Sequence, residues 1–189
     1  MKGSALAVIS DIHGCSIALN KALKIAMERQ AGWICILGDI LYHGPRNRLT
    51  HGYDPRSTAD TLNRLRNKII AVRGNCDAEV DQMMLTFPVT ADYNQLIWED
   101  RKLFMTHGHL FDPATLPLAS GDIYLQGHTH VSVLKQTSSG SYFFNPGSVA
   151  LPKDRSFGTM GILSNGKIEL VNIETGDTVE ELILPEVAS

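Results

Sequence analysis

The sequence contains few cysteines and no long apolar run. Its three cysteines, Cys15, Cys35 and Cys76, are an odd number without paired spacing. They argue against a disulfide framework and favour a reducing cytoplasm as the compartment. No segment approaches the roughly 20 apolar residues that span a bilayer, and the apolar stretch near the N-terminus is too short for a secretion signal. We therefore expect a cytoplasmic protein with no membrane partner.

An excess of positive charge is also missing. The formal net charge is -3, so the chain has no overall basic field for a long nucleic acid. Any affinity for phosphate must come from a local site. The sequence shows no repeat, low-complexity segment or interdomain linker, and its 189 residues fit one domain, residues 1–189, with a good core.

Five apolar runs are present, and each ends beside glycine in side chains that can bind metal ions. The clearest run covers residues 33–37 and is followed by Gly38 and Asp39. An unbroken apolar run is typical of a strand that is buried on both faces. Open α/β sheets place their ligands at the carboxyl ends of such strands. Counted with their polar ends, the five runs cover residues 6–14, 33–39, 69–75, 103–108 and 123–130.

Helices are predicted mainly in the first half of the chain and strands in the second. Apolar residues at helical spacing predict a helix over 16–30 between strands 4–9 and 33–37, which makes a βαβ unit with parallel strands. Shorter helices are predicted over 57–67, capped by Ser57, and over 77–85, capped by Asp77. Further strands are predicted over 69–72, 89–98, 102–106, 122–125, 131–136, 142–144, 159–163, 167–172 and 179–184.

This order of elements predicts an α/β fold in four layers. Two mixed β-sheets would pack face to face, flanked by helices on the outside. Asn165-Gly166 predicts a tight hairpin between two of the later strands. The long loop over 40–55 has a length that is typical of functional loops. Exposed apolar strand edges in the second half leave a homo-oligomer of undetermined size open.

Seven oxygen and nitrogen donors follow the predicted strands and converge on one rim. One histidine alone would usually be a solvated loop residue, but independent loop residues would not recur at the ends of successive strands. Carboxylate, amide and imidazole donors without thiolate suit Mn, Fe, Zn, Co or Ni. Seven donors are too many for one ion and fit two ions about 3.5–4 Å apart if Asp39 is shared. The donors are Asp11, His13, Asp39, Asn75, His107, His128 and His130.

The order of the short motifs that carry these donors resembles the calcineurin-like metallophosphoesterases over residues 6 to about 150, and most closely the small bacterial YfcE-type phosphodiesterases. The resemblance implies one metal site with Asp11, His13, Asp39 and His130, and a second with Asp39, Asn75, His107 and His128. It implies two divalent ions, with Mn the first expectation and Ni, Co, Zn or Fe as the others. The motifs are Asp11-Ile-His13, Gly38-Asp39, Gly74-Asn75, His107-Gly108 and Gly127-His128-Thr-His130.

The resemblance also implies a reaction. A metal-dependent phosphoric diester hydrolase of this kind uses a metal-bridging hydroxide to attack phosphorus, with Asp39 and Asn75 in the catalytic centre. Many relatives carry histidine after Gly-Asn, where this chain has Cys76. A thiol with a pKa of about 8.5 is a poor substitute for imidazole at neutral pH. We therefore expect substrates with good leaving groups to be favoured. His43 or His109 is the candidate to replace the missing histidine. Cys76 can also be explained as a small buried residue.

Substrate contacts are expected mainly from the loop that follows Asp39. His43 and Arg46 lie in that loop, and Arg73 and Cys76 flank Asn75. Either arginine is a candidate to pair with a phosphate oxygen, although a solvated arginine or a pair with an acidic neighbour explains each equally well. The expected substrate is a small phosphodiester.

Two other functions stay open. One is a phosphomonoesterase or nuclease on the same site. The other is a protein-interaction scaffold that keeps the fold without turnover, which the complete set of seven donors argues against.

Overall fold

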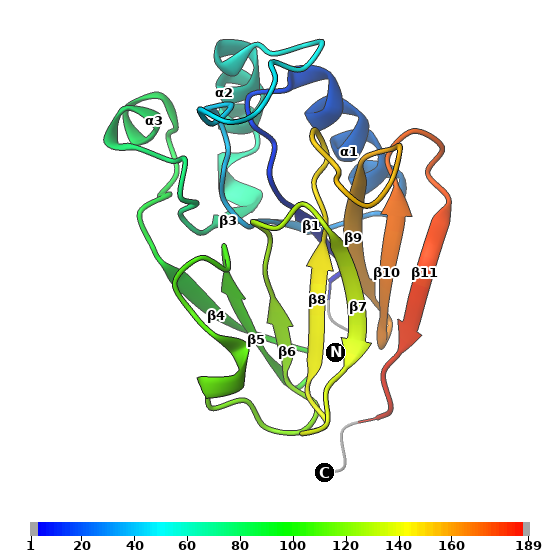
Figure 1. Ribbon diagram of the computed structural model, residues 1–189. Coiled ribbons are helices and arrows are strands. Elements are labelled where there is room, and N and C mark those ends of the chain that lie inside the picture. The colour runs from blue at the N-terminus through cyan, green and yellow to red at the C-terminus, as the bar shows by residue number, and fades with distance from the viewer. Residues whose placement is uncertain (1–3, 187–189) are drawn as a thin grey trace.

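The structure, a computed structural model, describes residues 4–186 and arranges their strands in two mixed β-sheets (Figure 1). The six-stranded sheet contains β1 (Leu6–Ile9), β2 (Trp33–Ile36), β3 (Ile69–Ala71), β9 (Thr159–Ser164), β10 (Lys167–Asn172) and β11 (Thr178–Ile183). The five-stranded sheet contains β4 (Tyr93–Trp98), β5 (Arg101–Thr106), β6 (Ile123–Leu125), β7 (Ser132–Gln136) and β8 (Tyr142–Pro146). This arrangement confirms the predicted α/β sandwich of two mixed sheets.

Strand order brings distant parts of the chain together. The first sheet has the order β11-β10-β9-β1-β2-β3, and the second has the order β4-β5-β6-β8-β7. Strands β1, β2 and β3 are parallel, as the βαβ pattern predicts, and β1 also pairs antiparallel with β9. Strands β5, β6 and β8 are parallel in the other sheet. The loops after β1, β2, β3, β5 and β6 can therefore meet at one end of the sandwich.

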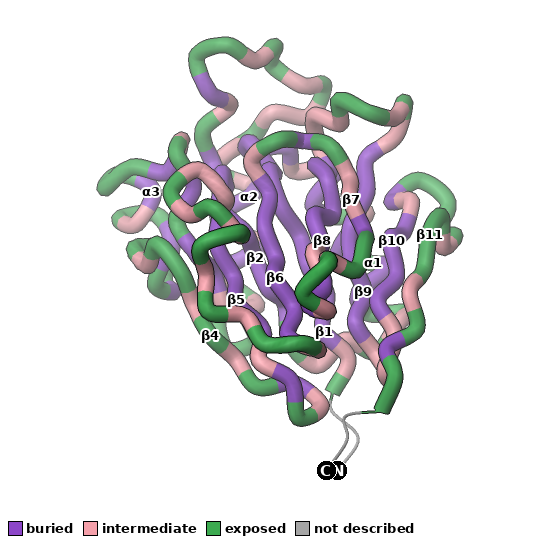
Figure 2. The backbone as a smooth tube through the Cα atoms, turned by 60° about the horizontal axis from the view of Figure 1, so that its bottom comes forward, coloured by how far each residue is buried: buried purple, intermediate pink, exposed green. Residues whose placement is uncertain are grey.

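Burial on both faces explains the unbroken apolar runs. In β1, Leu6 and Val8 lie in the core between the two sheets, whereas Ala7 and Ile9 lie in the core beneath the helices. Phe144 of β8 enters the core between the sheets from the other side and is fully buried. Figure 2 shows the central strands of both sheets as buried tubes surrounded by exposed loops. A central strand that is buried on both faces, such as β1, thus needs apolar residues at every position.

The helices α1 (Ser16–Glu28), α2 (Pro55–Arg64) and α3 (Glu79–Met84) all belong to the first half of the chain. Leu19 of α1 and Leu62 of α2 are buried against the outer face of the six-stranded sheet. No helix within residues 4–186 is long and apolar enough to cross a membrane.

Two predicted helix caps are wrong. Helix α2 begins at Pro55, and the carboxylate of Asp54 accepts a hydrogen bond from the backbone N–H of Ser57, so Asp54 is the cap. Proline at the first helical position explains the earlier start. Helix α3 begins after Ala78 rather than at Asp77, because the carboxylate of Asp77 accepts hydrogen bonds from the loop after β2.

The outer face of the five-stranded sheet is covered by a loop with one short 3-10 helix, η2 (Pro113–Thr115), where the sequence pattern predicts a helical layer. Phe111 packs edge-on against Phe104, with 5.7 Å between ring centroids. Pro113 and Pro117 interrupt this segment, and proline disrupts a helix interior. The prediction of a homo-oligomer stays a prediction, because the structure describes one chain.

Adjacent residues of β8 provide a test of this packing. Phe144→Ala should lower the free energy of unfolding by about 3–5 kcal/mol, because it removes a ring from the core between the sheets. Phe143→Ala is the matched control: Phe143 is half-buried on the opposite face, so its loss should be about 1 kcal/mol. Urea unfolding of the two variants measures both values, and equal losses would contradict the assigned faces.

Candidate metal centre

The structure brings the predicted donors together around Asp39. Nε2 of His13 lies 3.6 Å from Oδ2 of Asp39, and Nε2 of His107 lies 3.5 Å from Oδ1 of the same carboxylate. The two oxygens of Asp39 therefore face two different groups of donors. Asp39 follows β2 and is almost fully buried.

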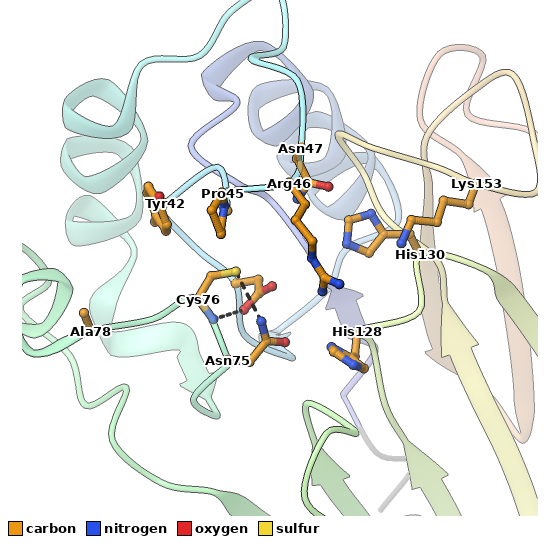
Figure 3. Close-up of a pocket in the computed structure, with 12 residues that line it drawn as sticks. Tyr42, Pro45, Arg46, Asn47, Asn75, Cys76, Ala78, His128, His130 and Lys153 are labelled. Atoms are coloured by element: carbon orange, nitrogen blue, oxygen red, sulfur yellow. Dashed lines mark hydrogen bonds between the residues drawn. The ribbon is translucent and has the colours of Figure 1, made fainter.

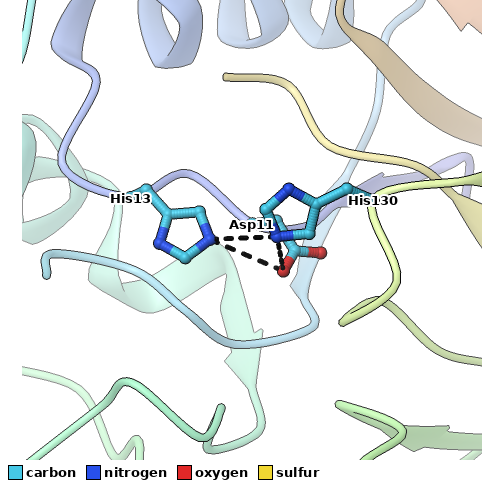
Figure 4. Close-up of side chains that lie close together, drawn as sticks. All are labelled: Asp11, His13 and His130. Atoms are coloured by element: carbon cyan, nitrogen blue, oxygen red, sulfur yellow. Dashed lines mark hydrogen bonds and ion pairs between the residues drawn. The ribbon is translucent and has the colours of Figure 1, made fainter. Parts of the chain in front are cut away.

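The first group consists of Asp11, His13 and His130 (Figure 4). Oδ1 of Asp11 lies 3.3 Å from Nε2 of His130 and 3.8 Å from Nε2 of His13. The Nε2 atoms of the two histidines are 3.2 Å apart. All three residues are buried. Three potential ligand atoms thus point at one common point between them.

The second group joins Asp39 to Asn75, His107 and His128. Oδ1 of Asn75 lies 3.0 Å from Nε2 of His107. The rings of His107 and His128 are 5.1 Å apart at their centroids. This group is more open than the first, since Asn75 is exposed and His128 is half-buried.

Backbone carbonyls orient the imidazoles. An Nδ1–H that donates to a carbonyl leaves Nε2 unprotonated in neutral imidazole, with its lone pair free for a metal ion. This pattern recurs at three of the four candidate histidines. The three bonds are His13 Nδ1 to Tyr42 O (2.9 Å), His107 Nδ1 to Leu37 O (2.6 Å) and His130 Nδ1 to Leu151 O (2.7 Å).

A divalent cation fits this set of donors. Among the described residues, Oδ1 of Asp11 is a buried oxygen with no hydrogen-bond partner. Its other oxygen accepts hydrogen bonds from the Ser10 hydroxyl and the His128 backbone N–H. A buried carboxylate oxygen is costly to leave unpartnered, and facing Nε2 lone pairs repel each other. A cation between these atoms would satisfy all of them.

The electrostatic environment favours the ligand forms of Asp11, His13 and His128, whereas burial lowers the pKa of His130 but its contact with the Asp11 carboxylate raises it overall. Burial lowers the pKa of both His13 and His128, which favours neutral imidazole. Burial by itself would raise the pKa of Asp11, but His130, His107 and the Ser10 hydroxyl lower it overall. Asp11 is therefore held as a carboxylate.

Unusual backbone geometry is concentrated at these donors. Asp11, His13, Asp39, His128 and His130 all have positive φ, between 47° and 67°. Few residues other than glycine adopt this left-handed region, and such strain is concentrated at functional sites. Gly74 has a related role, because a Cβ there would collide with the carboxylate and backbone nitrogen of Asp39. Sequence spacing does not reveal these dihedral angles.

Asp77 is a further residue of the candidate site, where the sequence pattern predicted a helix cap. Its carboxylate accepts hydrogen bonds from the backbone N–H groups of Asp39 (2.9 Å), Ile40 (2.7 Å) and Gly74 (2.7 Å). Burial raises its pKa to about 6, against the effect of these donors. The bonds tie the loop after β2 to the loop after β3. Asp77 thereby fixes Asp39 relative to Asn75.

A second set of hydrogen bonds holds the loops of the site together. The Ser148 hydroxyl donates to the backbone carbonyl of Asp11 (2.8 Å). The Asn145 amide donates to the carbonyl of Gly127 (2.8 Å). These residues follow or end β8, as a structural turn beside the centre. They hold the loops that carry Asp11 and His128.

A pocket of about 650 Å³ opens over the centre (Figure 3). The predicted residues Asn75, Cys76, His128, His130 and Arg46 line it, together with Asp39. Lys153 also lines it, and no pattern in the sequence marked that residue. The pocket is large enough for a small molecule.

Cys76 lies against Asp39. Its backbone N–H donates to Oδ1 of Asp39 (2.8 Å), and its thiol is half-buried. Burial, followed by the charge of Asp39, raises the pKa of this thiol to about 12. This shift favours the neutral thiol. The Sγ atom also lies in a group with His13 and Asp39 whose potential ligand atoms are all within 4.8 Å of one another.

Three other predicted residues do not line the pocket. The ring of His43 packs edge-on between Tyr42 and Tyr53, with centroids 4.7 Å and 5.4 Å away. His109 lies behind the second group, with its ring centroid 5.3 Å from that of His107. Arg73 is exposed beyond the end of β3.

Comparisons with known proteins agree with this geometry. A model of the calcineurin-like phosphoesterase superfamily domain matches residues 5–167. The chain belongs to this superfamily. It is 44% identical over 176 residues to Phosphodiesterase YfcE of Escherichia coli strain K12, covering 93% of this chain and 95% of that protein. The proteins of the same name from strains CFT073 and O157:H7 match equally.

Solved structures agree. The structure of YfcE, described as a phosphoesterase from E. coli, has a TM-score of 0.91 and 42% identity, covering 96% of this chain and 100% of that one. Vps29 of Entamoeba histolytica, complexed with Zn²⁺, has a TM-score of 0.64 at 18% identity, covering 95% of this chain and 98% of that one. The second likeness shows a shared fold.

The hydrogen bonds of Asp77 predict two separable losses. Asp77→Ala should lower the free energy of unfolding by about 2–3 kcal/mol, because three buried N–H groups lose their acceptor. It should also weaken Mn²⁺ binding about tenfold or more, since Asp39 is no longer held in place. Urea unfolding and titration with Mn²⁺ measure the two effects.

Asp81→Ala is the matched control. Asp81 is also buried but accepts one hydrogen bond, from the Ala78 backbone N–H, and touches no candidate ligand. It should cost about 1 kcal/mol and leave Mn²⁺ affinity unchanged. Equal Mn²⁺ affinities in the two variants would contradict the positioning role of Asp77.

Proposed function

We propose that this chain is a dinuclear metal-dependent phosphodiesterase that hydrolyses small phosphodiesters. Its family and its 44% identity to a named phosphodiesterase support a phosphoric diester hydrolase. The single observation that carries the dinuclear form is the carboxylate of Asp39, whose two oxygens face His13 and His107 respectively.

The six other candidate ligands divide into two sites that share this carboxylate. Asp11, His13 and His130 would complete one site, and Asn75, His107 and His128 the other. When bound, two divalent ions would neutralise the phosphate and activate water for in-line attack on phosphorus. The protein's own contribution is to hold the ligands rigidly, through Asp77 and the carbonyls on each Nδ1.

The metal is proposed from the chemistry of the donors. Imidazole, carboxylate and amide without thiolate suit Mn²⁺ first, with Ni²⁺, Co²⁺, Zn²⁺ or Fe²⁺ as the other candidates. All three cysteines are free thiols, which supports the reducing cytoplasm as the compartment.

The pocket favours a small substrate. Its volume of about 650 Å³ suits a diester with compact arms, and the net charge of -3 offers no extended basic track for a long nucleic acid. A phosphomonoesterase on the same site is the second candidate. Assays of aryl phosphodiesters and monoesters with each metal separate the two, and preferential turnover of monoesters would overturn the diesterase.

Asp39→Asn tests the shared ligand. The amide of asparagine cannot bridge two cations as a carboxylate does, so the variant should bind fewer metal ions and lose turnover of bis(p-nitrophenyl) phosphate. Metal content by mass spectrometry and nitrophenolate release measure the two. Asp60→Asn, on the exposed surface of α2, is the matched control. Full activity in Asp39→Asn would refute the mechanism.

Cys76→His tests the account of leaving groups. A neutral thiol with a pKa of about 12 cannot donate a proton at neutral pH at the rate of an imidazole. The histidine should raise kcat for alkyl aryl phosphodiesters with poor leaving groups by about tenfold or more. Esters of p-nitrophenol should change little. Equal changes for good and poor leaving groups would count against this explanation.

A further inference from the structure

Two basic side chains, Arg46 and Lys153, line the pocket over the candidate metal centre. Arg46 comes from the loop after β2 and Lys153 from the segment after β8, and His130 lies between them in Figure 3. Asp39 is the one acidic residue that lines this pocket within residues 4–186, and it already belongs to the metal centre. The pocket wall therefore leaves both positive charges without a counter-ion.

The backbone fixes the position of Lys153 beside the centre. Its N–H donates to the carbonyl of His130 (3.0 Å), and Nδ1 of His130 donates in return to the carbonyl of Leu151 (2.7 Å). The segment is thus tied to a candidate ligand at two points. The backbone of Lys153 is therefore fixed relative to His130.

The neighbours of Lys153 are engaged elsewhere. Asp154 accepts a hydrogen bond from the backbone N–H of Ser132 (3.0 Å), and Nε of Arg155 lies 3.5 Å from the same carboxylate. In the described part of the chain, the ammonium of Lys153 forms no ion pair and no hydrogen bond. Its charge is available to a ligand.

Arg46 is held from the other side. Its turn is closed by two hydrogen bonds of Asn47, to the carbonyls of Gly44 (3.3 Å) and His43 (2.8 Å). The turn lies against Cys76, since a Cβ at Gly44 would be 3.2 Å from its sulfur. The guanidinium points into the pocket (Figure 3) and has no salt-bridge partner among residues 4–186.

A simple phosphodiester does not need these two charges. With two divalent ions, Asp11 and Asp39, a hydroxide and a singly charged diester, the charges of the centre cancel. Arg46 and Lys153 add two positive charges to the rim. A phosphate monoester group carries about -1.5 to -2 at neutral pH and accepts hydrogen bonds from guanidinium and ammonium. The negative charge of such a group therefore matches the surplus positive charge of the pocket rim.

We propose that Arg46 and Lys153 select phosphodiesters that carry a second phosphate on one of their arms. The inference rests on the proposed phosphodiesterase function and specifies its substrate class. The guanidinium supplies a planar pair of donors and the ammonium a compact charge, so the two hold the second phosphate while the diester lies on the metal centre.

Two substrates that differ by one phosphate provide the test. The p-nitrophenyl ester of thymidine 5′-phosphate is compared with the same ester carrying a 3′-phosphate, in the Mn²⁺-loaded protein. Both release nitrophenolate by the same bond cleavage, so their ratio of kcat/KM reports the added phosphate. We expect the 3′-phosphate to raise kcat/KM about tenfold, mainly through KM, and the preference to shrink as ionic strength rises.

Lys153→Gln and Arg46→Gln should each lower this preference about fivefold. Lys153→Arg keeps the charge and should keep the preference. Lys24→Gln, which removes an exposed charge from α1, is the matched control and should behave as wild type. Equal kcat/KM for the two substrates in wild type, or an equal loss for both in the variants, would overturn the inference. Release of nitrophenolate from neither substrate would instead refute the proposed function.

Discussion

Repulsion among buried lone pairs is the constraint on which the rest of the site depends. The carboxylates of Asp11 and Asp39 and the Nε2 atoms of His13 and His130 face one another inside the protein. Such repulsion is stronger in a poorly screened interior than in water. These side chains could relieve the repulsion by rotating away from one another. They do not rotate, because each imidazole is fixed through Nδ1 and the loop of Asp39 is held by Asp77.

The same strands that bury the core carry the candidate ligands at their ends. Strands β1, β2 and β3 come from one sheet and β5 and β6 from the other, and their carboxyl ends meet over one edge of the core between the sheets. Loss of packing there would move the two halves of the donor set apart. A rigid core and a rigid metal centre therefore depend on each other. The Ser148 hydroxyl, in the segment after β8, adds a link to the other sheet through its hydrogen bond to the carbonyl of Asp11.

Sequence reasoning reached the fold and the gathering of donors because both depend on periodicity. An unbroken apolar run predicts a strand buried on two faces, and the position of Asp39 or Asn75 after such a run predicts where its side chain lies. It failed where a residue's role depends on three-dimensional neighbours. Asp77 has the chemistry of a cap, but its carboxylate accepts hydrogen bonds from backbone groups of the loop after β2 as well as of its own loop. Lys153 is ordinary in sequence and significant through its tie to His130.

The place of β9 has a consequence for the synthesis of the protein. Strand β9 lies beside β1 in the middle of the first sheet, although the two are at opposite ends of the chain. Every candidate ligand leaves the ribosome before β9 does. The nascent chain then carries every candidate metal donor while β1 still has an unpaired edge, a state that favours aggregation. Emergence of the C-terminal strands, rather than of any ligand, therefore completes the centre.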